Sequence, residues 1–470
     1  MNEIHRSFWL KQALAADDDV APTLEGDARA DVAIVGGGYL GLWAALELKS
    51  REPALDVAIV ERDICGAGAS GRNSGFVINY WAKFPALERL FGTDEARRIG
   101  AVAAADVAEI GRFCRANGID ADYRLSGWLW GATCAAHTGA WRPVLDALAR
   151  IQAVPFQVLS AKDIAGRWGL DGLTGGGVLE PTCATVQPAK LARGLRRVAL
   201  ARGVRIYERS PMVRLLRGAR PAVVTAHGTL NAGKVVLAMN AWAAGFRELR
   251  RSFVVVAADA AMTEPIPDRL REIGWADGPA VTDSRAMIVG LRPTVDGRVK
   301  HGKGNGAMAF GGDIGTFYDG PARRLDLMRK EFAQAVPRLA DVATAETWSG
   351  PIDRTAAGLP YFGPLPGSET VFFGVGFSGN GVGPTRLGAR VLASLVQGVR
   401  DEWSSMGLVR APENAFPPEP FRAIGGALVR RAVMRKDRLD HAGRAADPIT
   451  RALVRFVPGG VAPTAERPAP

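Results

Sequence analysis

Apolar and polar residues follow a strand–helix–strand pattern in the first part of the chain. Short apolar runs at 31–35 and 57–60 flank a segment, 42–49, whose apolar residues recur at helical spacing. Short apolar runs bounded by glycine or charged residues predict buried strands, whereas a 3.6-residue period predicts a helix packed on one face. Residues 31–61 are therefore predicted to form a βαβ unit.

Three further patterns extend the prediction along the chain. Residues 86–118 have the apolar spacing of helices. Short β-branched runs separated by glycines predict an antiparallel sheet over 253–318. Strand-like runs around a turn at His227 and Gly228 predict a β-meander, at 203–207, 213–216, 222–225 and 234–237.

Composition places the chain among ordinary globular proteins. Its 470 residues are 47% hydrophobic and 23% charged, and that length predicts two domains. No stretch reaches the ~20 apolar residues that a membrane span needs, and Asp17, Asp18 and Asp19 stand where a signal peptide would be apolar. We therefore expect a cytoplasmic protein.

Charge and potential metal ligands narrow the function only slightly. A net charge of +11 favours anionic ligands or surfaces without choosing among them, and we expect no nucleic-acid partner. The four cysteines contain no C-x-x-C pair, and the five histidines stand apart, without the spacing that brings two ligands to one ion. The sequence thus predicts reduced cysteines and no metal site.

The turn after the first predicted strand carries a G-x-G-x-x-G motif. Gly36 permits the tight turn, Gly38 lets the backbone approach a pyrophosphate, and Gly41 lets the next helix pack closely on the strand. The helix N-terminus would face the phosphates, and Glu61, which ends the second strand, would face a ribose hydroxyl. This context favours a dinucleotide site over a purely structural turn. The carboxylate disfavours a 2′-phosphate, which leaves FAD or NAD.

Two glycine-rich segments favour a flavin over a nicotinamide. Small residues at 65–76 would expose backbone N–H groups to a phosphate or an isoalloxazine edge, and Arg72 would neutralise pyrophosphate charge. The alternative is a flexible surface loop. Residues 372–384 predict a second strand, glycine loop and helix start, and that helix N-terminus would stabilise negative charge on a reduced flavin. The alternative there is a turn used for packing only.

These motifs and three others give the chain a resemblance to a known family. The others are Val186-Gln187-Pro188-Ala-Lys190, Lys234-Val-Val-Leu-Ala-Met-Asn240-Ala-Trp242, and Trp348-Ser-Gly-Pro-Ile-Asp353-Arg354-Thr355 continuing to Tyr361-Phe-Gly363. Over roughly residues 5–400 the chain resembles the D-amino-acid-oxidase-like family of FAD-dependent oxidoreductases. Its motifs most resemble those of the γ-glutamylputrescine-oxidase-like and aminophosphonate-oxidoreductase branches.

The resemblance implies FAD as the cofactor and two interleaved domains. The implied fold class is α/β combined with α+β, with a Rossmann-like FAD-binding domain of the glutathione-reductase type and an antiparallel-sheet substrate domain. The FAD-binding domain would comprise 28–85, 155–245 and 345–400, and the substrate domain 86–154 and 246–344.

Residues 401–470 lie outside the family core and are predicted to form a C-terminal helical extension. Its segment 421–438 has the pattern of a basic amphipathic helix. We expect this helix to pack across the chain's own FAD-binding domain, with contact to a membrane or a partner as the less favoured alternative.

The resemblance also implies which residues surround the flavin. The implied cofactor-binding residues are Gly36, Gly38, Gly41, Glu61, Arg62, Ser70, Arg72, Asn73, Ser74, Val213 near the adenine, Asn240, Gly376, Gly379, Asn380 and Gly381. The candidates for the reacting face are Asn380, Arg292, Tyr361 and Trp348, with core packing as the alternative for both aromatic residues.

Cations in the predicted antiparallel sheet are candidates for recognising an anionic substrate tail. They are Arg285, Arg292, Lys300, His301 and Lys303. Converging charged donors would bind a phosphonate or carboxylate, although a solvated strand face is the favoured alternative for the group. Of these residues, Arg292 is the one expected to point inward.

Two departures from the family pattern bear on the substrate. Ile352 stands four positions after Trp348, where glycine-oxidase-like relatives carry the arginine that grips the substrate α-carboxylate, and Gly379 replaces a second arginine. A bidentate guanidinium is hard to replace. The sequence therefore favours a small amine with a remote anion, such as an aminoalkylphosphonate, over an α-amino acid.

The expected reaction is FAD-dependent oxidation of a C–N bond. The resulting imine would hydrolyse to an aldehyde and an amine or ammonia, with O2 as acceptor giving hydrogen peroxide. The alternative is a flavoprotein dehydrogenase that passes electrons to a protein or quinone acceptor. A nicotinamide enzyme would leave the glycine cluster at 374–383 without a role.

Overall fold

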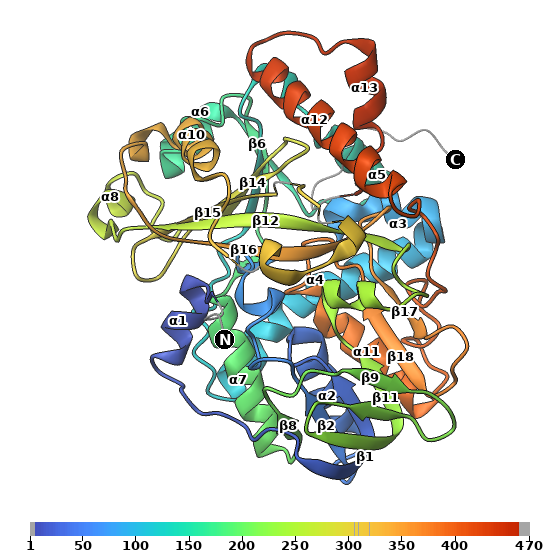
Figure 1. The fold of residues 1–470 in the computed structure, drawn as a ribbon. Helices are drawn as coiled ribbons and strands as arrows, with labels where there is room; N and C mark the ends of the chain where they lie inside the picture. The colour runs from blue at the N-terminus through green and yellow to red at the C-terminus, as the bar shows by residue number, and fades with distance from the viewer. Residues whose placement is uncertain (1–4, 305, 309, 319, 460–470) are drawn as a thin grey trace.

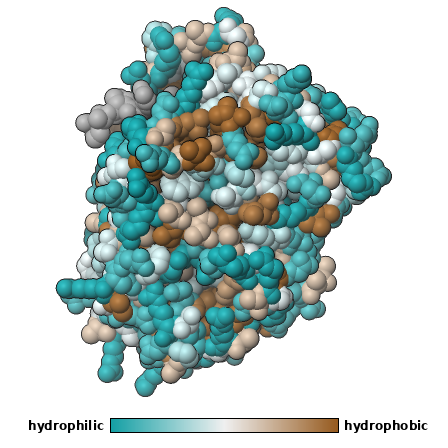
Figure 2. Space-filling model, turned by 180° about the vertical axis from the view of Figure 1, so that it is seen from behind, coloured by the Kyte–Doolittle hydropathy of each residue, from teal (hydrophilic) through white to brown (hydrophobic). Residues whose placement is uncertain are grey.

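Two large sheets organise the chain, one in the lower half of Figure 1 and one in the upper half. This computed structural model describes residues 5–304, 306–308, 310–318 and 320–459. The last part of the predicted extension, 460–470, lies outside the described residues. Seen from behind in Figure 2, the surface is mostly hydrophilic, with apolar side chains gathered in a band across its upper part.

The first sheet is built on a parallel core that contains the predicted βαβ unit. Its strand order is β17-β18-β11-β1-β2-β8. The bounds are β1 (Gly26–Val35), β2 (Val57–Val60), β8 (Arg205–Tyr207), β11 (Gly228–Leu237), β17 (Tyr361–Pro364) and β18 (Val371–Val375). Residues 32–35 and all of β2 are buried, as expected for parallel strands covered on both faces. The short strands β9 (Arg214–Leu216) and β10 (Ala222–Val224) form an antiparallel meander with β11, whereas β8, which was predicted to belong to the same meander, pairs in parallel with β2.

Helices from distant parts of the sequence cover this sheet. They include α2 (Tyr39–Arg51), α7 (Pro188–Ala201) and α11 (Pro384–Gln397), and both α7 and α11 pack against α2. The helices α3 (Phe84–Phe91) and α4 (Thr93–Ala116) form over the segment predicted as helical, and α4 packs on α3 and α11. One continuous apolar core joins these helices to the first sheet.

The second sheet is mostly antiparallel, with the order β16-β12-β15-β14-β13-β4-β6-β5. Its strands are β4 (Trp128–Gly131), β5 (Gln157–Leu159), β6 (Gly177–Glu180), β12 (Phe253–Thr263), β13 (Ala280–Asp283), β14 (Val289–Pro293), β15 (Val299–Gly304) and β16 (Thr344–Thr355). The pair β13–β4 is parallel and the other neighbours are antiparallel. A third, two-stranded sheet pairs β3 (Phe76–Val77) with β7 (Ala184–Thr185).

The sheet topology moves two of the boundaries predicted from sequence. β5 and β6 fall within 155–245, and β16 falls at the start of 345–400, yet all three pair in the second sheet. Short strands carry no local signal for the sheet that they join, because pairing depends on residues far away in the sequence. We propose that residues 155–180 and the strand at 344–355 belong with the substrate domain.

The remaining helices are mostly short and lie at the edges. They are α1 (Phe8–Leu14), α5 (Arg142–Arg150), α6 (Ala161–Trp168), α8 (Pro267–Glu272), α9 (Gly315–Tyr318), α10 (Leu325–Ala335), α12 (Phe421–His441) and α13 (Pro448–Val454). Helix α6 begins at a capping box in which Ser160 and Asp163 satisfy each other's backbone N–H groups. Among the described residues, no helix is both long enough and apolar enough to span a membrane.

The predicted amphipathic helix forms as α12 but does not pack where the sequence suggested. Its residue Val433 contacts Met287 and Val457 in a small apolar cluster, and its C-terminal end lies beside residues 135–137. These contacts belong to loops of the second sheet, so the expectation that α12 crosses the FAD-binding domain is wrong. The amphipathic pattern predicted a helix with one covered face but could not identify the surface that covers it.

Candidate active site

A cavity of about 670 Å3 lies between the two sheets. One wall comes from the turn after β1, the loop at 61–76 and the loop at 377–382, and the other comes from β12, β13, β14, β15 and β16. Volumes of roughly 300–1,000 Å3 are typical of ligand and cofactor sites. The elements that the glycine motifs predicted to form a cofactor site therefore do meet around one space.

The G-x-G-x-x-G turn brings a helix N-terminus to this cavity. Gly36 has a φ of +114°, and a Cβ atom there would lie 2.5 Å from the carbonyl oxygen of Ala238. Helix α2 starts at Tyr39 after Gly38, which offers no side-chain cap, and both residues line the cavity. A helix N-terminus presents backbone N–H groups and a partial positive charge, which suit a pyrophosphate. Gly41 does not line the cavity but packs against Gly36.

Glu61 occupies the position that the motif predicted, at the end of β2 and on the cavity wall. Its carboxylate oxygens accept hydrogen bonds from the backbone N–H groups of Gly37, at 2.7 Å, and Asp63, at 2.9 Å. Burial raises the pKa of this carboxyl group. These bonds fix the side chain beside the glycine turn, where a ribose hydroxyl is expected to bind. Nearby, Arg62 stacks over the ring of Trp242 at 4.6 Å.

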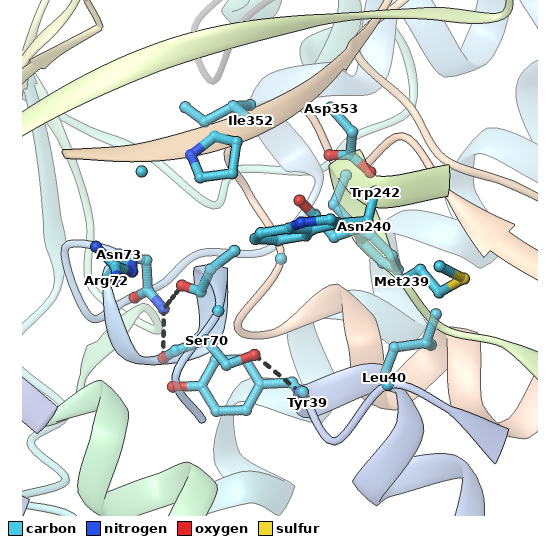
Figure 3. A pocket seen from close by; sticks show the side chains of 18 of the residues that line it. Tyr39, Leu40, Ser70, Arg72, Asn73, Met239, Asn240, Trp242, Ile352 and Asp353 are labelled. Carbon is cyan, nitrogen blue, oxygen red and sulfur yellow. Dashed lines mark hydrogen bonds between the residues drawn. The ribbon is translucent and has the colours of Figure 1, made fainter. Parts of the chain in front are cut away.

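The loop after β2 folds into a set of short-range hydrogen bonds (Figure 3). The Ser70 hydroxyl accepts a bond from the backbone N–H of Tyr39 at 2.9 Å, and the Asn73 amide donates to the carbonyls of Ala69 and Ser70. The Arg72 guanidinium donates to the carbonyl oxygens of residues 67, 349 and 5. Arg72 thus ties the loop to β16 and the N-terminal segment, and this differs from the predicted neutralisation of a pyrophosphate.

A second helix N-terminus opens on the same cavity. Helix α11 follows Gly383, which provides no side-chain cap, and the preceding residues Gly379, Asn380 and Gly381 line the cavity. The Asn380 amide donates to the carbonyl oxygen of Asn79 at 3.2 Å. Gly376 lies outside the lining, and its N–H donates to Asp353 at 2.5 Å.

Two buried oxygen atoms on the cavity wall have no hydrogen-bond partner. They are Oδ1 of Asn240, a residue with a φ of +49°, and Oδ1 of Asp353 (Figure 3). Burial raises the pKa of Asp353 to about 6. Unpaired buried polar atoms are costly unless a ligand or water satisfies them. Together with the two helix N-termini, they fit an elongated ligand that carries both phosphates and hydrogen-bonding rings. Val213, 70% exposed, marks the rim of the cavity.

Three of the four candidates for the reacting face lie away from the cavity. Trp348 donates from its indole nitrogen to the carbonyl oxygen of Arg72 at 2.8 Å, within an apolar cluster that includes Trp9. Arg292 donates to the carbonyl oxygens of Ser74 and Val186 and stacks on Trp9. The predictions for Trp348, Arg292 and Tyr361 are therefore not supported by their positions; Asn380 alone of the four lines the cavity.

Tyr361 is held on the far side of its strand, and we predict that its hydroxyl is dispensable for turnover. The hydroxyl lies 3.3 Å from Glu413, and Arg410 stacks on the ring at 4.2 Å. The variant Tyr361→Phe should lower the free energy of unfolding by about 1 kcal/mol, the usual value of one hydrogen bond. Its rate of anaerobic flavin reduction should stay within about twofold of the native rate. A tenfold slower reduction with unchanged flavin content would return Tyr361 to the reacting face.

The second sheet contributes a buried lysine that the sequence did not distinguish from its neighbours. Lys300, on β15, is 3% exposed and lines the cavity, and its Nζ donates to the Ser74 hydroxyl at 2.5 Å. Burial, and after it the nearby Arg292, lowers the pKa of Lys300 to about 7. Lys300 therefore combines cavity exposure with a pKa near neutrality, a combination that often marks functional groups.

The other cations of this sheet are engaged elsewhere. Lys303 also lines the cavity, but its Nζ pairs with Glu331 at 2.8 Å. His301 stacks on Phe332 on the opposite side of the strand, and Arg285 pairs with Asp283 and Glu331. The expectation of a solvated strand face is wrong for the group, because all five side chains, those of Arg292 and Lys300 included, are nearly fully buried.

The two positions where glycine-oxidase-like relatives carry arginines are adjacent in space. Ile352 and Gly379 both line the cavity, and a Cβ atom on Gly379 would meet the Ile352 side chain at 3.6 Å. An aliphatic side chain and a bare backbone cannot bind a carboxylate by a bidentate pair. These two positions therefore form an apolar part of the cavity wall, and the strand register places Lys300 six residues away from Ile352 along β12.

One prediction about potential metal ligands needs correction. The sequence placed the histidines apart, yet ligand atoms of Cys134, His137 and His441 lie within 4.8 Å of one another. His441 donates from Nδ1 to the carbonyl oxygen of Asp437, and its Nε2 lies 2.6 Å from the Arg285 guanidinium. A guanidinium donating to that nitrogen occupies its lone pair and opposes a second cation, so the grouping supports no metal assignment.

Two helices begin at glycine turns on the cavity, and an acidic residue follows the second parallel strand. With the adjoining antiparallel sheet, these features indicate a dinucleotide-binding protein of the flavoprotein class. The chain belongs to the DAO family of FAD-dependent oxidoreductases, whose model matches residues 31–395. FAD is accordingly the cofactor that the cavity residues would hold. The identification from sequence motifs is confirmed, and residues 401–470 lie beyond the matched region.

Curated relatives span nearly the whole chain. The chain is 28% identical to gamma-glutamylputrescine oxidoreductase of Escherichia coli over 417 residues, which cover 86% of this chain and 93% of the relative. It is 26% identical to the probable oxidoreductase OrdL of Rhizobium meliloti, with coverage of 90% and 94%.

Solved structures confirm the predicted fold class. Glycine oxidase from Geobacillus kaustophilus aligns with a TM-score of 0.66 at 24% identity, covering 80% of this chain and 96% of that structure. L-proline dehydrogenase from P. horikoshii aligns with a TM-score of 0.63 at 20% identity, covering 81% and 96%. At these identities the likeness concerns the fold.

Proposed function

We propose that this FAD-dependent oxidoreductase oxidises a small amine that carries a remote anionic group, with O2 as the electron acceptor. The observation that carries the proposal is that Lys300 lines the cavity, where Ile352 and Gly379 stand in place of the arginine anchors of the glycine-oxidase-like pattern. The likeness to gamma-glutamylputrescine oxidoreductase supports an amine as the substrate class. An aminoalkylphosphonate or a γ-glutamylputrescine-like amine has the required chemistry.

Bound FAD supplies the two-electron acceptor for cleavage of the substrate C–H bond. The substrate amine must first lose its ammonium proton, and burial in a largely apolar cavity favours the neutral amine. Lys300 would pair with the remote anion, and the largely apolar lining of the cavity would hold the carbon chain and exclude water. The imine then takes up water and breaks down to an aldehyde and an amine or ammonia, and O2 becomes hydrogen peroxide.

Anaerobic visible absorbance tests this proposal directly. The purified holoenzyme is mixed separately with 2-aminoethylphosphonate, γ-glutamylputrescine, putrescine, sarcosine and glycine. We expect one of the two anionic amines to bleach the flavin band, while glycine and sarcosine leave it unchanged, because Ile352 and Gly379 stand where glycine-oxidase-like relatives carry the arginines that grip an α-carboxylate. Bleaching by glycine or sarcosine would contradict the substrate assignment.

The acceptor is tested by admitting air to the bleached enzyme. We expect the flavin band to return within seconds with formation of one hydrogen peroxide per amine oxidised. Slow recovery in air, with rapid recovery on adding a quinone, would instead favour the dehydrogenase alternative.

A further inference from the structure

We propose that the C-terminal extension docks the protein on an anionic lipid surface through the outer face of α12. This goes beyond the proposed function, because it concerns a surface far from the cavity in sequence and outside the region matched by the family. The surface consists of six exposed side chains in one line, Phe421, Ile424, Leu428, Arg431, Arg435 and Arg438, called here the α12 stripe.

The spacing of the stripe places all six residues on one face of the helix. The intervals along the sequence are three and four residues in alternation, and such a repeat follows one side of an α-helix. The first half is apolar, with Phe421 67% exposed, Ile424 57% and Leu428 46%. The second half is cationic. One helix therefore presents an apolar segment and an arginine segment toward the same side.

The opposite face of α12 fixes this orientation. Val433 is buried against Met287 and Val457, and His137 donates from Nε2 to Asp440 at 3.2 Å. His441, at the end of the helix, is held by Arg285 and by Thr133. These contacts come from the body of the protein, so the helix cannot rotate to bury its apolar stripe without breaking them.

Neighbouring segments expose further apolar side chains beside α12. Gly311 donates to the Glu419 side chain, which brings the adjoining Phe310, 66% exposed, near the apolar end of the stripe. The next helix, α13, packs on α12 and exposes Ile449, and Phe456, two residues beyond the end of α13, is exposed as well. Large apolar side chains that cluster at a surface mark an interaction site more often than scattered ones do.

Charge identifies the partner. Residues 421–456 contain nine arginines and lysines against three aspartates, so this segment carries a net charge of +6, more than half of the protein's +11. Apolar residues followed by arginines on one helix face suit the headgroup region of an anionic bilayer, where the apolar side chains insert and the arginines meet lipid phosphates. A second protein copy with the same positive surface would be repelled.

Vesicle flotation of the full-length holoenzyme tests the proposal. We expect the protein to float with vesicles of equal parts phosphatidylglycerol and phosphatidylcholine, to float far less with phosphatidylcholine alone, and to dissociate at high salt. The variant Ile424→Glu/Leu428→Glu and the variant Arg431→Gln/Arg435→Gln/Arg438→Gln should each lower the partition by about tenfold or more. The matched control Val154→Glu/Val158→Glu changes two exposed valines elsewhere and should float normally.

Flavin content and thermal unfolding show whether each variant is folded, so loss of flotation can be assigned to the surface. Equal flotation with both kinds of vesicle, or flotation that survives either α12 variant, would overturn the proposal. Gel filtration of the lipid-free protein decides the main alternative. If the native protein is a dimer and the Ile424→Glu/Leu428→Glu variant is a monomer, the stripe is a contact between copies of this chain. That result would also overturn the lipid-docking proposal.

Discussion

Replacing Gly41 with alanine is expected to leave the protein unable to retain its flavin. A Cβ atom on Gly41 would lie 2.0 Å from the carbonyl oxygen of Gly36 and 3.2 Å from the Ile34 side chain. Gly36 cannot move aside, because its own Cα faces the backbone of Ala238. The crossing of α2 over β1 would have to open, and both the turn and the helix N-terminus at the cavity would shift.

We expect Gly41→Ala to have a large effect on both the free energy of unfolding and the FAD content. Overpacking at a site closed by backbone atoms costs about 3 kcal/mol of the free energy of unfolding. FAD content, read as the ratio of flavin to protein absorbance after purification, should fall more than tenfold. The control Gly166→Ala sits inside α6 with no atom within 4 Å of the added carbon, and should raise stability by about 0.5–1 kcal/mol.

A third substitution separates loss of the fold from loss of the flavin site. Gly38→Ala would place its Cβ 3.0 Å from the Ser70 hydroxyl, a side chain that can rotate. This variant should unfold at nearly the native temperature but bind FAD more weakly, because the added methyl group stands where the backbone approaches the pyrophosphate. Full flavin retention by Gly41→Ala would show that the turn does not position the cofactor.

The βαβ unit could be predicted because its signals are local. Glycines at 36, 38 and 41 impose a turn that few other residues allow, and the apolar runs on either side fix the two strands. The same holds for the loop at 377–383 before α11. Both motifs proved to lie on one cavity although more than 300 residues separate them in sequence.

Side-chain direction could not be predicted in the same way. Arg292 and Lys300 are direct partners across β14 and β15, so strand alternation puts them on the same face. Yet the longer Arg292 turns to two backbone carbonyls, at Ser74 and Val186, while Lys300 faces the cavity. The direction of each side chain depends on which carbonyl groups a distant loop leaves without a hydrogen-bond partner. The spacing of residues along the sequence does not predict this.

Long-range packing also determines which surface of the protein the C-terminal extension covers. The sequence identified α12 as amphipathic, but its covering surface is formed by the loops around Met287 and His137, more than 140 residues away. The same contact brings His441 to His137 and Cys134. Groupings of this kind arise from the meeting of two segments and leave no periodicity in either of them.

Removing the Lys300 charge is expected to abolish the preference for an anionic substrate. The variant Lys300→Met should lower kcat/KM for 2-aminoethylphosphonate on the order of 100-fold, the cost of leaving a buried anion without its charged partner. The rate with propylamine, which has a methyl group in place of the phosphonate, should change by less than about threefold. Lys330→Met, an exposed lysine on α10, is the matched control and should behave as the native enzyme.

The pH dependence of kcat/KM for the same two substrates is a second test of the Lys300 charge, and the direction of the change follows from the pKa of Lys300. Burial lowers the pKa of Lys300 to about 7, so the ammonium form that pairs with an anion is lost as the pH rises above that value. Both substrate amines deprotonate alike, so the ratio of their kcat/KM values cancels that step. The ratio should fall about tenfold per pH unit above pH ~7 in the native enzyme and stay flat in Lys300→Met. If the variant slows both amines equally, Lys300 serves a step common to all substrates and the anion must bind elsewhere.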